Sequence, residues 1–193
     1  MAYQRKKTKQ EIKKEQLIEA VKLLTKDCDL SELTVRDICA KLNFSTGSFY
    51  HYFKDKGEIL ACILSTVDEH LLTVEQERFT DQQYDNIMLT VQEYAQYNVD
   101  SGVNLIVHIN GRKIAGNGQL YLHHQRPIFQ ILQRCYEAGL KNGEFKTPMS
   151  SQELAEMTLV VMRGYAFDWA KYNGEYDLVA KMSQCISFMI KGL

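Results

Sequence analysis

The chain has 193 residues, of which 45% are hydrophobic and 24% charged, a balance typical of a globular protein that buries a core. No apolar run approaches the ~20 residues of a membrane span, and the basic N-terminus lacks the apolar stretch of a secretory signal. Two prolines and five scattered cysteines without a C-x-x-C pair favour an all-helical cytoplasmic protein with reduced thiols over a disulfide framework or a zinc site.

The net charge of −1 hides an asymmetry between the two ends of the chain. Residues 1–60 hold 12 basic and 9 acidic residues, which gives +3, whereas residues 61–193 hold 11 basic and 15 acidic residues, which gives −4. A basic end on an acidic body is typical of a protein with a nucleic-acid partner. Basic residues are densest in residues 1–14, which predict an arm that is either solvated or laid along DNA.

Three helices are predicted next along the chain. Apolar residues recur at i, i+3, i+4 and i+7 within residues 10–26, which indicates an amphipathic helix. Thr34 and Asp37 have the spacing of a capping box, which opens a second helix. Asn43 tolerates the positive φ of a tight turn, and Ser45 then caps a third helix. A helix, a three-residue turn and a short helix have the spacing of a helix-turn-helix.

The third helix has an unusual set of polar residues. Small residues at its start would let the backbone approach DNA, and their hydroxyls could reach bases or phosphates. Large polar-tipped rings follow, and a lysine opens the next helix, where free N–H groups also favour an anion. These residues are Thr46, Gly47, Ser48, Tyr50, His51, Tyr52 and Lys56. An ordinary helical subdomain would explain Phe49 and Phe53 as core, but not the three polar rings and the basic helix start.

Residues 33–60, LTVRDICAKLNFSTGSFYHYFKDKGEIL, closely resemble the signature of the TetR (tetracycline-repressor-like) family of transcriptional regulators, approximately T-V-R-D-I-A-x-x-A-G-V-S-x-G-T-F-Y-H-Y-F-x-x-K-x-x-L-L. The resemblance implies that the helix after Ser45 enters the major groove. It implies phosphate contacts at Thr34, Ser45, Tyr50, Tyr52 and Lys56, and contacts at or near base edges at Arg36, Thr46, Gly47, Ser48 and His51. Two departures, Cys39 for alanine and Leu42-Asn43-Phe44 for Ala-Gly-Val, are compatible with packing.

Helical patterning continues through the rest of the chain. The predicted segments are 83–100, 103–114, 119–141, 152–172 and 175–191, which with the four before make about nine helices, as the resemblance implies. The expected architecture is all-α. An N-terminal three-helix DNA-binding domain at residues 1–57 precedes a larger helical domain for effector binding and dimerisation at residues 58–193.

The last two helices are predicted to form a dimer interface. Residues 154–170 are apolar around most of the helix, which indicates burial on several sides. The final helix carries two apolar rows, Leu178, Met182, Cys185 and Met189 in one and Val179, Ile186 and Leu193 in the other. Such rows could pack as a four-helix bundle across a twofold axis, and the resemblance implies the same interface.

An effector pocket should be apolar with a few placed polar groups. The candidates are Tyr94, Tyr97, Asn98, His108, Arg126, Phe129, Arg163, Phe167 and Trp169, with Asn110, Arg112 and His123 as further possibilities. Each aromatic residue could equally belong to the core, and each charged residue to the surface. The arginines leave room for an anionic group on the effector.

Neither an enzyme nor a metal site is expected. No catalytic motif or glycine-rich phosphate loop is present, and no histidine pair has the i, i+4 spacing of a helical zinc site. The sequence thus predicts a homodimeric repressor that needs no cofactor, binds a palindromic double-stranded DNA operator and is released by a small molecule. An activator with the same DNA-binding domain, or a small-molecule-binding protein without operator affinity, remains an alternative.

Overall fold

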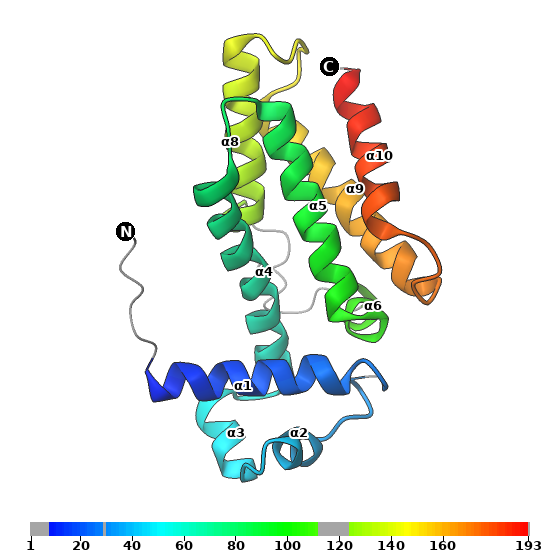
Figure 1. Cartoon of the computed structure of the whole chain (residues 1–193). Helices are drawn as coiled ribbons and strands as arrows, with labels where there is room; N and C mark the ends of the chain where they lie inside the picture. The colour runs from blue at the N-terminus through cyan, green and yellow to red at the C-terminus, as the bar shows by residue number, and fades with distance from the viewer. Residues whose placement is uncertain (1–7, 29, 112–123, 193) are drawn as a thin grey trace.

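The computed structural model describes residues 8–28, 30–111 and 124–192, and within these ranges every regular element is a helix (Figure 1). The helices are α1 (Lys9–Leu24), α2 (Val35–Lys41), α3 (Thr46–Tyr52), α4 (Lys56–Arg78), α5 (Gln83–Ser101), α6 (Val103–Gly111), α8 (Pro127–Asn142), α9 (Ser151–Lys171) and α10 (Leu178–Lys191). The predicted all-α class is confirmed for this part of the chain. The arm at residues 1–7, together with Arg112, His123 and Leu193, lies outside the described residues.

Helices α1 to α3 and the start of α4 form a small domain at one end of the molecule, here called the headpiece (Figure 1). The predicted capping box is present, because Asp37 N–H donates to Thr34 Oγ1 at 3.2 Å and Thr34 N–H donates to Asp37 Oδ2 at 2.8 Å. Asn43 adopts the predicted positive φ, at 54°. Ser45 caps α3 by accepting a hydrogen bond of 3.2 Å from Ser48 N–H. The local signals in the sequence therefore produce a helix-turn-helix.

Two separate hydrophobic cores share one long helix. Ile59 and Ile63 of α4 are buried in the headpiece core, whereas Val67 and Leu71 of the same helix are buried in the second core. The second core lies among α5 to α10 and the rest of α4, here called the body. The boundary expected after residue 57 stays a prediction, and α4 crosses it without a break. One continuous helix therefore joins the two cores.

Two helices of the body begin later than the sequence pattern suggested. Within the described residues, the segment predicted at 119–141 becomes helical only at Pro127, since proline suits the first helical position, where its missing N–H is not needed. The segment predicted at 175–191 begins at Leu178, where the side chain of Asp177 accepts a hydrogen bond of 2.9 Å from Ala180 N–H. Both shifts leave the order of the helices as predicted.

Three residues of the two apolar rows expected to form the dimer interface lie inside the protomer, whereas Val179, Cys185 and Met189 are half-buried and Leu193 is outside the described residues. Leu178, Met182 and Ile186 are buried in the body core, where α10 packs against α5 and α9. For these three residues the interface prediction was wrong, because the apolar stripe of an amphipathic helix also serves as an inward face. The exposed apolar residues of α9 and α10 are different ones. Val160 is 63% exposed and Phe188 is 82% exposed.

Candidate functional site

The exposed side of α3 lies at the end of the headpiece that points away from the body (Figure 1). Phe49 and Phe53 are buried in the headpiece core, as the sequence suggested, and they fix the orientation of the helix. Tyr50 is 60% exposed, and most of the other predicted contact residues are also at the surface. The exposed ones are Thr34, Arg36, Ser45, Thr46, Gly47 and His51, while Ser48 and Tyr52 are half-buried. We call these nine residues, Tyr50 included, the α3 surface.

Some hydroxyls of the α3 surface already have partners in the protein. Thr34 Oγ1 donates to Asp37 Oδ2 at 2.6 Å, and Ser45 Oγ lies 3.0 Å from Ser48 Oγ. These hydrogen bonds hold the starts of α2 and α3 in place. A phosphate contact at Thr34 or Ser45 would therefore add to a cap rather than use an unoccupied side chain.

Lys56 is engaged more strongly than the sequence suggested. Its ammonium group donates to the carbonyl oxygens of Leu30 at 2.9 Å and Leu33 at 2.7 Å, and it is half-buried. The side chain thereby ties the first turn of α4 to the segment before α2. A phosphate at this position would meet the positive charge of Lys56 and the N–H groups at the start of α4.

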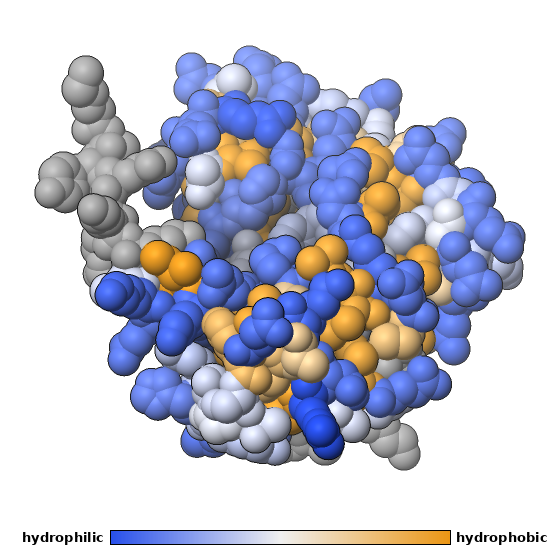
Figure 2. Space-filling model, turned by 60° about the horizontal axis from the view of Figure 1, so that its bottom comes forward, coloured by the Kyte–Doolittle hydropathy of each residue, from blue (hydrophilic) through white to orange (hydrophobic). Residues whose placement is uncertain are grey.

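Lysines of α1 lie against aromatic rings of the helix-turn-helix. Lys13 Nζ is 5.8 Å from the ring centroid of Phe44, and Lys14 Nζ is 5.6 Å from that of Phe53. Such cation–π contacts are weak when exposed, but they keep positive charge next to the α3 surface. From the headpiece end, the surface is mostly hydrophilic with apolar patches between the polar side chains (Figure 2).

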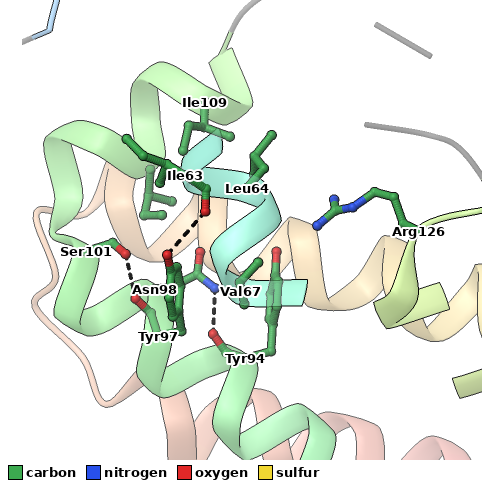
Figure 3. Close-up of a pocket in the computed structure, with 10 residues that line it drawn as sticks. Ile63, Leu64, Val67, Tyr94, Tyr97, Asn98, Ser101, Ile109 and Arg126 are labelled. Atoms are coloured by element: carbon green, nitrogen blue, oxygen red, sulfur yellow. Dashed lines mark hydrogen bonds between the residues drawn. The ribbon is translucent and has the colours of Figure 1, made fainter. Parts of the chain in front are cut away.

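A small cavity lies in the body between α4, α5, α6 and the start of α8. Its volume is about 20 Å³, room for about one water molecule. The wall is apolar on the side of α4 and α6 and carries polar groups from α5 and from Arg126 (Figure 3). The lining residues are Ile63, Leu64, Val67, Tyr94, Tyr97, Asn98, Ser101, Ile106, Ile109 and Arg126.

Tyr97 connects this cavity to both α4 and α1. Its hydroxyl donates a hydrogen bond of 3.2 Å to the carbonyl oxygen of Ile63 and also contacts the Thr66 hydroxyl. Its ring faces α1, where Lys22 Nζ lies 4.9 Å from the ring centroid. One residue of the cavity wall therefore touches the helix that runs into the headpiece and a helix of the headpiece itself.

The charged residue of the wall, Arg126, is paired with Asp68 of α4. Arg126 Nε donates to Asp68 Oδ2 at 2.9 Å, and Arg126 Nη2 donates to Asp68 Oδ1 at 3.0 Å. Tyr94 is buried nearby, and this burial raises the pKa of its hydroxyl, while the positive charges of Arg126 and Arg163 act in the opposite direction. An apolar cavity with a guanidinium group in its wall suits a partly apolar molecule with an anionic group.

The family model described as "Bacterial regulatory proteins, tetR family" matches residues 24–63, which contain the helix-turn-helix and the start of α4. The headpiece is a TetR-family domain. No curated protein sequence matches the chain significantly.

The complete TetR-type fold extends through the body. A FadR transcriptional regulator from Bacillus subtilis, solved with stearoyl-CoA, is 19% identical with a TM-score of 0.76, and the match covers 93% of this chain and 98% of that one. A Thermus thermophilus FadR repressor with lauroyl-CoA is 14% identical with a TM-score of 0.67, covering 93% and 94%. Salmonella enterica GusR is 15% identical with a TM-score of 0.73, covering 97% and 100%. At these identities the likeness establishes the fold.

The predicted effector residues fall into two groups, those that line the cavity and those that do not. Tyr94, Tyr97, Asn98 and Arg126 line the cavity. The other five do not line it. Phe129 and Trp169 are buried in the body core, Phe167 lies under Lys171, and His108 and Arg163 are half-buried. The side chain of Asn110 is not among those described.

The sequence did not single out the apolar half of the cavity or its ion pair. The α4 and α6 residues of the wall read as ordinary core positions, because pocket lining and core packing use the same residue types. Asp68 did carry a signal, since it is a carboxylate directly beside the apolar stripe of α4 at Val67 and Leu71. Buried carboxylates need a partner, which could have directed attention to Arg126.

Among the described residues, no group of three histidine, cysteine, aspartate or glutamate side chains is arranged to hold a metal ion. In the same part of the chain, none of the helices has the length and apolar character needed to cross a membrane.

Proposed function

We propose that the chain is a homodimeric transcriptional repressor that binds a palindromic operator through α3 and is released by a small molecule bound in the body. The observation that carries this proposal is the path of α4. This helix contributes Ile63, Leu64 and Val67 to the cavity and also enters the headpiece core. A ligand that widens the cavity by displacing α4 would move with it the headpiece that presents α3.

The α3 surface supports recognition in the major groove. Thr46, Gly47, Ser48 and His51 would lie at base edges, with Arg36 close by, and Tyr50 and Tyr52 at phosphates. A Cβ atom built on Gly47 would meet only Ser45 Oγ, at 3.7 Å. Nothing in the protomer therefore requires glycine at this position, whereas close approach to a duplex would.

A second copy of the chain is the proposed occupant of the exposed apolar face of α9 and α10. Helices α9 and α10 pack against each other in the protomer. Among the described residues of these two helices, Val160 and Phe188 are the most exposed apolar ones. Both are exposed in the protomer, and a twofold axis would pack each pair against its copy. The dimer would still use the last two helices, but through their outer residues.

The effector is proposed to be partly apolar with an anionic group. A cavity of about 20 Å³ is far smaller than the roughly 300–1,000 Å³ of most ligand sites, so the body has to open around the molecule. Two structural neighbours are described in complex with stearoyl-CoA and lauroyl-CoA. Long-chain acyl-CoA molecules share the required chemistry and are suitable first compounds for a screen.

The test is a mobility-shift titration of the full-length protein against DNA upstream of its own gene, with and without lauroyl-CoA. The expected result is salt-dependent binding that is sequence-specific and weakened by the effector. Lack of specific binding would favour the small-molecule-binding alternative. A reporter gene behind the same DNA separates a repressor from an activator, because deletion of the regulator raises expression only in the first case.

A further inference from the structure

The ion pair between Asp68 and Arg126 is buried and geometrically complete. Both side chains are only 9% exposed, and the two planar groups form parallel hydrogen bonds. Replacing such a pair with apolar residues is often neutral or even stabilising, because two charges must be removed from water to form it. Stability alone therefore does not account for this pair.

The pair lies where an incoming ligand would meet it. Arg126 is part of the cavity wall, and Figure 3 shows its side chain extending from the start of α8 toward α4. Asp68 directly follows Val67, which also lines the cavity. Tyr94, another residue of the cavity wall, lies close enough to Arg126 and Asp68 to feel both charges. The guanidinium group of Arg126 is therefore the charged group of the wall that an anion in the cavity would meet.

The pair also fixes α4 to the body. Asp68 stands 12 residues after Lys56, so a straight helix places it about 18 Å from the first turn of α4. Between them, Ile59 and Ile63 are embedded in the headpiece core. A rotation of α4 at Asp68 is therefore transmitted to the headpiece through packed side chains.

We propose that this ion pair is a latch, and that an oxyanion on the effector, a carboxylate or a phosphate, opens it by replacing Asp68 on Arg126. The inference rests on the proposed function, since it assigns the chemistry by which the effector acts. After the exchange, the guanidinium group remains paired. Asp68 is left as a buried carboxylate without a partner, which is strongly unfavourable. Helix α4 must then turn until this carboxylate reaches water, and the headpiece turns with it.

The experiment compares the full-length wild type with Asp68→Asn, which removes the competing charge but keeps the size of the side chain. Glu69→Gln is the matched control, because it removes an exposed carboxylate from the next position of the same helix. The probes are sodium octanoate, octyl phosphate and neutral octanamide, each titrated by calorimetry without DNA. Operator affinity and amide hydrogen exchange of α4 are measured without any probe.

For Asp68→Asn, we expect octanoate or octyl phosphate, whichever carries the oxyanion that fits Arg126, to bind about tenfold more tightly than to the wild type. The reason is that the charged group competing for Arg126 has been removed. Octanamide should bind equally to both proteins. The variant should also bind the operator about tenfold more weakly and exchange the amides of α4 faster, while Glu69→Gln resembles the wild type. A gain with octanoate alone or with octyl phosphate alone identifies the oxyanion.

The double variant Asp68→Asn/Arg126→Gln keeps a neutral hydrogen-bonded pair and should lose the preference for both oxyanions. It replaces the single variant if that protein does not fold. Equal binding of both oxyanions to wild type and variant, including no binding to either, would overturn the exchange. Unchanged operator affinity and α4 exchange in Asp68→Asn would overturn the latch. If the wild type bound no DNA, the proposed function would fail, but the titrations without DNA would still decide the exchange.

Discussion

The ammonium group of Lys56 donates a hydrogen bond of 2.7 Å to the carbonyl oxygen of Leu33, the residue directly before the cap of α2. A second hydrogen bond, to the carbonyl oxygen of Leu30, measures 2.9 Å. The start of α4 and the start of the helix-turn-helix are thus held together by one charged side chain. This relationship gives Lys56 a structural role in addition to its proposed place near a phosphate.

For Lys56→Met, we expect the free energy of unfolding to fall by about 1–3 kcal/mol, since two carbonyl groups lose a charged donor. Binding should weaken on any DNA sequence. The slope of log affinity against log salt concentration should fall by the contribution of about one phosphate contact. Urea unfolding and mobility shifts at several salt concentrations measure the two effects. Lys54→Met is the control, because Lys54 is exposed, and its stability should change by less than about 0.5 kcal/mol. An unchanged urea midpoint for Lys56→Met would contradict the structural role.

For Phe188→Glu and Val160→Glu, we expect monomers that keep their helical content. Both residues are exposed in the protomer, so a carboxylate there is harmless until a second copy covers it and leaves it buried without a partner. Met182→Glu should instead lose the fold, because Met182 is fully buried in the body core. Sedimentation velocity and circular dichroism separate the two outcomes. Intact dimers in both exposed-site variants would place the interface elsewhere.

For Asp37→Asn, we expect a loss of headpiece stability at neutral pH that disappears in acid. Hydrogen bonds from Thr34 lower the pKa of the Asp37 carboxyl below its ordinary value of 3.8. A lowered pKa means that the stabilisation is complete above the ordinary value and is lost as the pH falls through the folded-state value. Urea unfolding of variant and wild type between pH 7 and pH 3 should converge. A difference that is constant over this range, or equally large in Asp27→Asn, would argue against the cap.

For Tyr97→Phe, we expect the free energy of unfolding to fall by about 1 kcal/mol, because the hydroxyl that is hydrogen-bonded to α4 is removed. The contact between the ring and Lys22 is kept. Thr66→Val removes the other hydroxyl of this contact. Both substitutions break the same hydrogen bond. The double variant should therefore lose about 0.5–1 kcal/mol less unfolding free energy than the sum of the losses in the two single variants. Thermal unfolding of the four proteins measures this coupling, and strict additivity would show that the two hydroxyls act independently.

The headpiece was largely predictable because its signals are local. Thr34, Asp37, Asn43 and Ser45 each act on backbone groups within four residues, so their spacing in the sequence is enough to place two helices and a turn. The order of the body helices followed from apolar periodicity in the same way. These features depend on neighbours along the chain rather than on how distant helices pack.

The cavity and the dimer face were predictable only in part, because they depend on distant packing. An apolar residue on an amphipathic helix faces either its own core or another protomer, and Met182 and Phe188 carry the same hydropathic signal with opposite environments. The partner of Arg126 is separated from it by 58 residues. No periodicity links two positions that far apart.

Adjacent residues of α6 pack into different hydrophobic cores: Leu105 is fully buried in the headpiece core, whereas Ile106 is buried in the body core. During synthesis, the headpiece core therefore acquires the side chain of Leu105 only after more than half of the chain has been made. A fragment cut anywhere before α6 would expose the apolar surface that Leu105 covers. The excised helix-turn-helix would accordingly be prone to aggregate, and screens for DNA recognition should use the intact polypeptide.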